Sequence, residues 1–361
     1  MTAYPFPLIE IKGPPRQRGR QYGAQCKTLI ERSIDFYRWA FRRESALDWD
    51  VSAEKSREFI APIKAYDAEI LEEMEGVAEG ADRELTDILA LNVRSELVFL
   101  LAAQGKKAKP ACTSLAAAPP ATTAKETLIA QNWDWWARTR EQCILLRITQ
   151  PGRPSILQVV EAGLVAKTGM NSTGIGLCTN ALVSDKWRVG VPFHVILRGI
   201  LNATSMGEAI GAVTRAQRAS AGNYMIAHRD GMAINIEAAP EDQNLIYPQE
   251  GLLTHANHFQ IDHPNIQDQK LSLWPDSIVR DYRAAALLKD RRGAVDTLFI
   301  MNLLKDHFDH PLSICSHPPA DIPYEEAEQT NAAVIMNLSR GRFWVAKGPP
   351  CENTFVEVPF A

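Results

Sequence analysis

The hydrophobic periodicity of the chain changes near residue 110, and this change constrains the fold more than any other feature. Before it, a short apolar strand at 8–11 precedes apolar residues at helical spacing, which predicts helices over 21–43, 54–79 and 86–103. After it, short apolar runs predict strands at 128–133, 144–148, 156–160, 175–178, 224–227, 233–237, 252–256, 332–338 and 343–346. Helical patterns return at 192–201, 205–215, 275–288 and 295–306. Elements grouped in blocks favour an α+β layered fold over a strictly alternating one.

The composition of the chain indicates which kinds of molecule it can bind. With 46% hydrophobic and 23% charged residues, the chain has the composition of a globular protein. Its net charge is only -4 and it has no long basic run, which argues against nucleic acid as a partner. It has no apolar stretch of signal-peptide or membrane-spanning length. We therefore expect a cytoplasmic protein with a small-molecule partner and no membrane contact.

Cofactor and metal motifs are not visible in the sequence. The glycines at 169–176 form neither a dinucleotide fingerprint nor a phosphate loop, so we expect no cofactor. The six cysteines have no CxxC or zinc-finger spacing. His255 and His258 are three apart on a predicted strand and should point to opposite faces, and His307 and His310 lack a metalloprotease arrangement. We therefore expect no metal.

A cysteine stands at the junction between the two halves. Residues 104–110 are polar and basic, bounded by Gly105 and Pro110, as in an exposed connector, and Ala111 and Cys112 follow. If the bond between Ala111 and Cys112 breaks, Cys112 gains an α-amino group whose pKa of about 8 is close to that of a thiol. One residue then supplies both nucleophile and base. The alternative is that Cys112 is a small buried residue at the start of a strand.

Several motifs in fixed order surround this cysteine. They are Gly13-Pro14, Arg16 and Gly19; Cys112-Thr113; Gln131-Asn132-Trp133-Asp134-Trp135; Arg229-Asp230-Gly231 with Asn235-Ile236-Glu237; Thr254-His255-Ala256-Asn257-His258-Phe259; and Gly348-Pro349-Pro350-Cys351-Glu352. Together they resemble the acyl-coenzyme A:6-aminopenicillanic acid acyltransferase family, also called peptidase family C45, of the N-terminal-nucleophile (Ntn) hydrolases. The resemblance covers nearly the whole chain.

The resemblance implies a four-layer αββα Ntn-hydrolase sandwich with a helical N-terminal segment and with Cys112 at the end of a central strand. It also implies that a precursor cleaves itself into a helical segment, 1–111, and a catalytic region, 112–361. We expect the two chains to stay associated, because the N-terminal helices have apolar faces that need burial. A homo-oligomer is a further assembly that the sequence leaves open.

The same resemblance assigns roles to individual residues. Cys112 is the expected nucleophile, and Asn257 the expected donor to the oxyanion; the alternative for Asn257 is a turn-capping residue. Asp134 is expected near the new α-amino group and the amine part of the substrate, unless it is a strand carboxylate that faces water. Trp133, Trp135 and Trp136 either line an acyl pocket or belong to the core.

Two places depart from the family pattern. The family usually has arginine after its Ser-Ile-Cys segment, where it contacts an acidic group of the substrate, but here Ser316 follows Cys315. A bidentate carboxylate clamp is therefore missing at Ser316, which argues against a penicillin-type substrate. Residues 118–126 also form an insertion at an expected hairpin tip, where insertions are tolerated.

These observations leave three classes of function. The first is a self-processing cysteine amidase that cleaves a linear amide bond of a small N-acyl or β-alanyl-type amide through a thioester. The second is an acyltransferase that moves an acyl group from a thioester such as acyl-coenzyme A to an amine of the 6-aminopenicillanic acid type. The third is a non-catalytic relative that keeps the fold. We favour hydrolysis, because no coenzyme A phosphate-binding motif is visible in the sequence.

Overall fold

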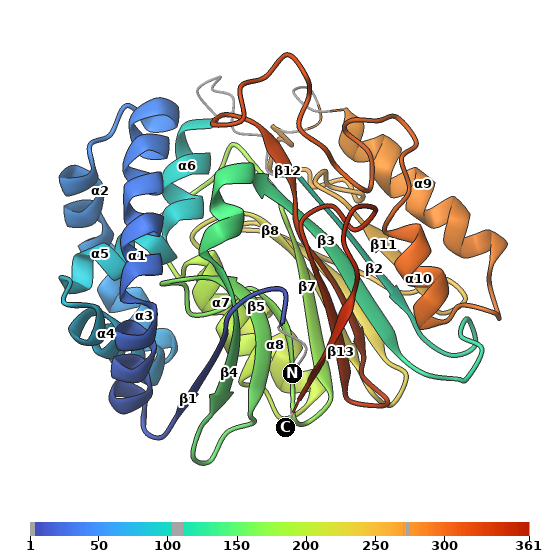
Figure 1. The fold of residues 1–361 in the computed structure, drawn as a ribbon, viewed down its shortest axis with the longest axis horizontal. Coiled ribbons are helices and arrows are strands. Elements are labelled where there is room, and N and C mark those ends of the chain that lie inside the picture. Colours follow the sequence, from blue (N-terminus) through green and yellow to red (C-terminus); the bar gives the residue numbers. More distant parts are fainter. Residues whose placement is uncertain (1–3, 103–110, 270, 272–274, 361) are drawn as a thin grey trace.

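Two β-sheets lie face to face between two layers of helices (Figure 1). The computed structural model describes residues 4–102, 111–269, 271 and 275–360. The blue N-terminal helices lie on one side of the sheets, and the orange helices of the last third lie on the other side (Figure 1). This is the expected four-layer αββα sandwich, so the α+β fold class is confirmed.

The first sheet has eight strands and lies next to the N-terminal helices. Its strands, in spatial order, are β1 (Leu8–Lys12), β4 (Cys143–Thr149), β5 (Ile156–Glu161), β6 (Thr168–Asn171), β7 (Ile175–Ala181), β8 (Gly222–His228), β9 (Ala233–Ala238) and β10 (Gln243–Ile246). β1 pairs with β4 in parallel, and the other neighbours are antiparallel. The N-terminal segment thus contributes an edge strand to the sheet built by the second half.

The second sheet has six antiparallel strands and contains the cysteine junction. Its spatial order is β11 (Leu252–His255), β2 (Ala111–Ala117), β3 (Leu128–Trp136), β12 (Glu328–Asn337), β13 (Arg342–Lys347) and β14 (Val356–Pro359). β2 and β3 form the expected hairpin around residues 118–127, and β12 and β13 form the second expected hairpin. Because β2 has a neighbour on each side, Cys112 sits on an interior strand.

The helices cover the outer faces of both sheets. The first layer contains α1 (Pro15–Ser45), α2 (Trp49–Ser56), α3 (Ile60–Tyr66), α4 (Ala68–Ala81), α5 (Leu85–Asn92), α6 (Arg94–Ala102), α7 (Phe193–Leu201) and α8 (Met206–Thr214). The second contains α9 (Asp276–Asp290) and α10 (Thr297–Leu303), which pack on the six-stranded sheet. Within the described parts of the chain, no helix is both long and apolar enough to cross a lipid bilayer.

The helix predicted over 54–79 is wrong as a continuous element. A 3-10 turn at Arg57–Phe59 separates α2 from α3, and Asp67 separates α3 from α4. Asp67 has an extended backbone, and its carboxylate accepts a hydrogen bond from Glu69 N at 3.0 Å, which is an N-cap. β6, β10 and β14 were not predicted, and the connector at 104–110 lies outside the described residues.

Helices α1 and α4 cross with their backbones in contact, and glycines make this approach fit. A Cβ atom on Gly19 would lie 2.2 Å from Glu73 O, and one on Gly76 would lie 2.3 Å from Arg16 O. Gly23 in α1 has the same relation to Val77 O, at 2.2 Å. Side chains at these positions would force the helices apart. The glycines therefore fix how the N-terminal layer is assembled.

Buried ion pairs tie this layer to the second half of the chain. Glu73 of α4 is fully buried between Arg18 of α1 and Arg198 of α7, and Arg198 reaches both carboxylate oxygens at 2.8 Å. Burial opposes ionisation, but the two guanidinium groups outweigh it and lower the pKa of Glu73. Arg94 of α6 forms a second buried pair with Glu161 of β5. Both clusters join residues before 111 to residues after it.

The glycine contact can be tested by Gly23→Ala. The added methyl group meets backbone atoms that cannot move aside, so we expect the free energy of unfolding to fall by about 1–3 kcal/mol. Urea denaturation followed by circular dichroism measures this. The matched control is Gly207→Ala in α8, where a Cβ has no neighbour nearer than 4.0 Å, and stability should be kept or slightly raised. Equal stability of both variants would contradict the close crossing of α1 and α4.

Candidate active site

Cys112 is the second residue of β2 and is only 4% exposed. It lies directly across from Trp133 of β3, so the two side chains share one face of the sheet. Both belong to the core cluster that lies between the sheets and under the N-terminal helices. The thiol therefore points into the layer between the two sheets, away from α9 and α10.

Side chains from three other segments hold the backbone of Cys112. Its N–H donates to Asn257 Oδ1 at 2.7 Å. Its carbonyl oxygen accepts from Asn180 Nδ2 at 3.1 Å and from Arg280 Nη1 at 2.7 Å. The predicted nucleophile and the predicted asparagine are thus in direct contact. Each backbone polar group of Cys112 is fixed from outside its own hairpin.

Arg280 of α9 organises this contact, although no sequence motif indicates it. Its Nη1 also donates to Thr113 Oγ1 at 3.0 Å, and its Nη2 donates to Asn257 Oδ1 at 3.1 Å. Asp276, one helical turn earlier, accepts from the same Nη2 at 3.2 Å. In the sequence, Asp276 and Arg280 read as an ordinary surface pair at i,i+4 spacing. Only the tertiary fold shows that Arg280 is 2% exposed.

Asn180 reaches Cys112 from the end of β7 in the facing sheet, and it was also missed. Its Oδ1 accepts from Ser114 Oγ at 2.6 Å and from Asn223 Nδ2 at 2.9 Å, which fixes the amide orientation. Its Nδ2 also donates to His255 O at 3.3 Å. A polar residue in a fully buried strand needs such partners, so an asparagine at the end of an apolar run is the signal that was available.

Asn257 has the partners that an amide donor near the thiol requires. Its Oδ1 accepts from Cys112 and Arg280, and its Nδ2 donates to Ala181 O at 3.0 Å. Its backbone N–H donates to Ser277 Oγ at 2.7 Å. Because an amide nitrogen carries two hydrogens, one remains for an oxyanion in addition to the bond to Ala181. Asn257 can therefore donate to an oxyanion without losing its present hydrogen bonds.

Asp134 lies across from Ala111 rather than beside the Cys112 thiol. Strand alternation places its side chain on the opposite face of the sheet from Trp133. Its Oδ1 accepts from Thr330 Oγ1 at 2.6 Å, while its buried Oδ2 has no hydrogen-bond partner among the described residues. Burial raises the pKa of Asp134 to about 7, although Arg280 opposes the shift. The alternative of a water-facing carboxylate is wrong, because Asp134 is fully buried.

Ser316 is connected to Asp134 by hydrogen bonds through Thr330. Ser316 N donates to Thr330 Oγ1 at 3.0 Å, and Thr330 N donates to Ser316 O at 3.1 Å. The hydroxyl of Thr330 then donates to Asp134. The loop where the family usually carries arginine therefore packs directly behind the carboxylate, and Thr330 is a further member that sequence spacing did not indicate.

Trp133 lies beneath a buried cation near the thiol. Lys167 Nζ is 4.2 Å from the centroid of the Trp133 ring, which is cation–π geometry. Burial and Arg94 lower the pKa of Lys167 to about 8, and the charge on Cys112 acts in the opposite direction. No motif in the sequence indicates Lys167 as a site residue.

Trp135 is held by the N-terminal helices. Its Nε1 donates to Tyr37 Oη at 2.9 Å, and the Arg94 guanidinium lies 4.8 Å from its ring centroid. Tyr37 in turn donates to Glu161 Oε1 at 2.8 Å. Thus Trp133 faces the cysteine, whereas Trp135 connects the site to α1 and α6.

The expected arrangement of two histidines is wrong. β11 ends at His255, so His255 and His258 do not continue one strand, and their rings stack with centroids 6.3 Å apart. His255 Nε2 lies 2.8 Å from Glu237 Oε1, and His263 Nε2 lies 3.3 Å from Glu237 Oε2. His258 Nδ1 lies 2.8 Å from Ser277 Oγ. These three are hydrogen-bonded histidines.

A buried cysteine near the start of an interior strand, in a four-layer αββα sandwich, defines the class as an Ntn-hydrolase fold. The family model described as acyl-coenzyme A:6-aminopenicillanic acid acyl-transferase matches residues 121–350. A curated relative from Emericella nidulans, the acyl-coenzyme A:6-aminopenicillanic-acid-acyltransferase 40 kDa form, is 30% identical over 310 residues. The match covers 85% of this chain and 84% of the relative. The chain belongs to the acyl-coenzyme A:6-aminopenicillanic acid acyl-transferase family.

Solved structures show a more distant likeness. A mutant of conjugated bile acid hydrolase from Clostridium perfringens is 17% identical, with a TM-score of 0.46, over 69% of this chain and 92% of that chain. Penicillin V acylase from Agrobacterium tumefaciens is 11% identical, with a TM-score of 0.42, over 65% of this chain and 83% of that chain. Likeness of this degree carries no information about the substrate.

The buried carboxyl of Asp134 predicts a pH-dependent stability difference. A carboxyl whose pKa is raised in the folded state binds a proton more tightly there than in the unfolded chain, so its ionisation costs stability as pH rises from about 4 to about 7. In a Cys112→Ala background, Asp134→Asn should therefore stabilise the protein more at pH 8 than at pH 5. The expected difference is about 2–3 kcal/mol, measured by urea denaturation at both pH values.

The control for this experiment is Asp296→Asn, which changes an N-cap carboxylate of α10 that accepts from Phe299 N at 2.7 Å. Asparagine caps a helix N-terminus about as well as aspartate, so this substitution should change stability little at either pH. An effect of Asp134→Asn that is the same at both pH values would show that the carboxyl titrates normally.

Proposed function

We propose that the chain is a self-processing Ntn cysteine amidase that cleaves a linear amide bond of a small N-acyl or β-alanyl-type amide. The observation that supports this proposal is the set of hydrogen bonds that the Cys112 backbone makes with Asn257, Asn180 and Arg280. These contacts do not depend on the bond between Ala111 and Cys112. They would hold the new α-amino group in place after that bond breaks.

Self-processing follows from ordinary acyl chemistry. The Cys112 sulfur attacks the Ala111 carbonyl carbon, the C–N bond breaks, and the nitrogen of Cys112 takes a proton to become the α-amino group. A thioester then joins Ala111 to the sulfur. Water hydrolyses it, which leaves a carboxylate on Ala111 and a free thiol on Cys112. The products are chains 1–111 and 112–361.

Turnover repeats this sequence on a substrate amide. The α-amino group accepts the thiol proton, the sulfur attacks the substrate carbonyl, and the leaving amine takes a proton as the thioester forms. We propose that Asn257 Nδ2 donates to the oxyanion. The partnerless Oδ2 of buried Asp134 is suited to accept a hydrogen bond from an amine, either the α-amino group or the amine part of the substrate.

Lys167 supports the first attack in the precursor, before any α-amino group exists. Its lowered pKa of about 8 means that a substantial fraction of its amine is neutral near that pH and can accept a proton. Once protonated, the ammonium stabilises a nearby thiolate. We therefore propose Lys167 as the group that assists Cys112 during self-cleavage.

The expected partners and compartment remain part of the proposal. The buried pairs of Glu73 with Arg198 and of Arg94 with Glu161 support continued association of the two chains after cleavage. No disulfide is formed among the described cysteines, which is the usual state of thiols in the cytoplasm. We propose a cytoplasmic enzyme that acts on a small molecule.

The cysteine assignment predicts a change in chain composition. Wild-type protein should run on a denaturing gel as two bands of about 12 and 28 kDa, using about 110 Da per residue. Cys112→Ala should give one band of about 40 kDa and no amide turnover, because the sulfur that attacks is gone. The matched control is Cys178→Ala, which removes another buried thiol on the facing strand β7 and should process like wild type.

A second variant separates the donor role from the nucleophile role. Asn257→Ala retains the sulfur but loses the amide donor, so processing should slow by about 10²–10³-fold. Gel time courses after rapid purification measure this rate. Splitting of Cys112→Ala would remove the cysteine from the mechanism, and wild-type speed in Asn257→Ala would remove the asparagine. A single intact wild-type band with no turnover would favour a non-catalytic relative.

Acyl transfer is the second candidate function, and family membership favours it, because the curated relative is named as an acyltransferase. Both candidates share one thioester and differ in whether water or an amine resolves it. We expect hydrolysis to dominate when 6-aminopenicillanic acid is offered with an acyl donor, because Ser316 removes the usual arginine. Mass spectrometry of the products, with hydroxylamine as a small control nucleophile, decides this. A major 6-aminopenicillanic acid adduct would establish the transferase instead.

A further inference from the structure

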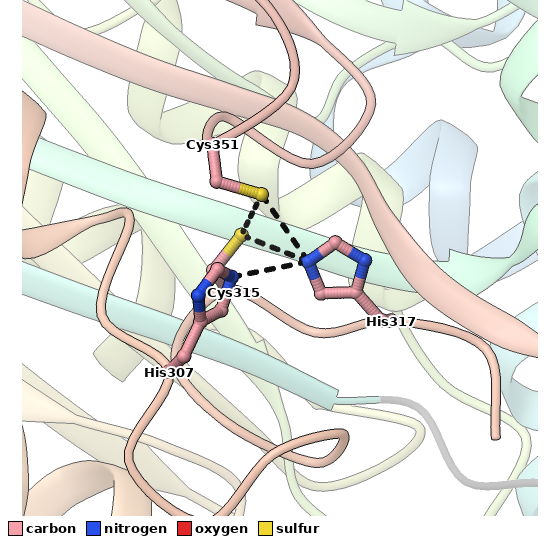
Figure 2. A group of neighbouring side chains, drawn as sticks. All are labelled: His307, Cys315, His317 and Cys351. Carbon is pink, nitrogen blue, oxygen red and sulfur yellow. Dashed lines mark hydrogen bonds between the residues drawn. The ribbon is translucent and has the colours of Figure 1, made fainter.

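Four side chains of types that can ligate metals converge beside the six-stranded sheet (Figure 2). His307 follows α10, Cys315 and His317 lie in the segment that leads to β12, and Cys351 lies between β13 and β14. One ligand atom from each of the four lies within 4.8 Å of all the others. Cys315 is buried, His317 is half-buried, and His307 and Cys351 are exposed.

Four of the six distances between these atoms are close to the edges of a metal-centred tetrahedron. Cys315 Sγ and Cys351 Sγ are 3.5 Å apart, and His317 Nε2 lies 3.6 Å from the first and 3.3 Å from the second. His307 Nε2 lies 3.2 Å from His317 Nε2. Zinc bonds of about 2.3 Å to sulfur and about 2.0–2.1 Å to nitrogen give tetrahedral edges of about 3.3–3.8 Å. The remaining distances, from His307 to the two sulfurs, lie within 4.8 Å, so a movement of the His307 side chain by about 1 Å would close the site.

The surroundings of His317 resemble the outer sphere of a zinc site. Its Nε2 faces the cluster, while its Nδ1 lies 3.5 Å from Glu352 Oε1. A carboxylate behind a ligating imidazole orients the ring and increases its basicity. The backbone of Cys315 is also fixed, because Cys315 N donates to Asp306 O at 3.0 Å. Glu352 and the backbone of Asp306 therefore help to position two of the four side chains.

A disulfide is the simpler alternative for Cys315 and Cys351. A disulfide would use the two sulfurs but would leave unexplained why both imidazole Nε2 atoms converge on the same point. A tetrahedral site with two sulfur and two nitrogen ligands uses all four, and this donor set selects zinc among the common protein metals. Two thiolates and two neutral imidazoles also balance the charge of one Zn²⁺ ion, with release of two thiol protons.

We propose that His307, Cys315, His317 and Cys351 form a structural zinc site that fastens the Ser316 loop to the turn between β13 and β14. This loop contacts Thr330, which donates to Asp134. The metal would thus fix the loop that packs behind the buried Asp134 carboxylate. The inference is independent of self-cleavage at Cys112. It replaces the expectation of no metal, which considered spacing within single segments only.

Metal analysis of untagged protein, purified under reducing conditions, tests the proposal. Wild type should contain about one zinc ion per chain, and Cys351→Ser should contain almost none. The matched control is His310→Ala. The His310 ring lies 5.7 Å from that of His307 and 5.2 Å from that of His317, centroid to centroid, yet it supplies no atom to the cluster. The control should retain its zinc.

Affinity gives the second measurement. Chelator-treated protein is titrated with zinc against a chromogenic competitor. Cys351→Ser should bind more than about 100-fold more weakly than wild type, since loss of an outer-sphere partner alone costs about 10–100-fold. Glu352→Gln should fall in that smaller range. Circular dichroism of Cys351→Ser checks that this substitution of an exposed residue leaves the fold intact.

A readout on wild-type protein keeps the test decisive if a variant misfolds. Cobalt added to the reduced apoprotein should produce thiolate-to-cobalt charge-transfer absorption in the near ultraviolet, and zinc should abolish it. Zinc should also protect Cys351 from a thiol reagent. Reduced wild type that binds neither ion, or a Cys351→Ser variant with wild-type zinc affinity, would overturn the proposal. So would a Cys315–Cys351 disulfide that persists in the reduced preparation.

Discussion

The position of β2 between β3 and β11 is the constraint on which the candidate site depends. Antiparallel pairing on both sides fixes the strand, and side chains from β7, α9 and the segment after β11 then bind the backbone of Cys112. If Cys112 acts as the proposed nucleophile, these backbone contacts set its direction of attack before any substrate arrives. The other features of the site, including the buried carboxyl of Asp134 and the cation over Trp133, are arranged around that fixed point.

Much of the fold could be predicted from the sequence, because apolar periodicity reports which faces are buried. The two hairpins, the late helices and the change near residue 110 all follow from such patterns. The predicted helix over 54–79 failed because its breaks preserve the apolar spacing, although Asp67 carried an N-cap signal. β6 and β10 were missed because strands of four residues are too short for a period to show.

The candidate site was predictable only where one short motif carried it. Cys112, Asn257 and Asp134 lie in motifs that resemble a known family, whereas Asn180, Arg280 and Thr330 reach them from separate segments. Nothing in a local window distinguishes a buried helical arginine from an exposed one. The same limit hid the Cys315–Cys351 cluster, because its ligands come from three segments that meet only after the sheet has formed.

The buried pair of Glu73 and Arg198 affects whether the cleaved protein can refold. If the chain is cut before Cys112, these two charges belong to different polypeptides, and separating the chains would take from Arg198 the carboxylate that pairs with it, while Glu73 would keep only Arg18. Folding of the precursor is a unimolecular reaction, but reassembly of the cut form would be bimolecular. The mature protein would then owe its persistence to slow unfolding, so an enzyme molecule once lost to heat would not be recovered by cooling a dilute solution.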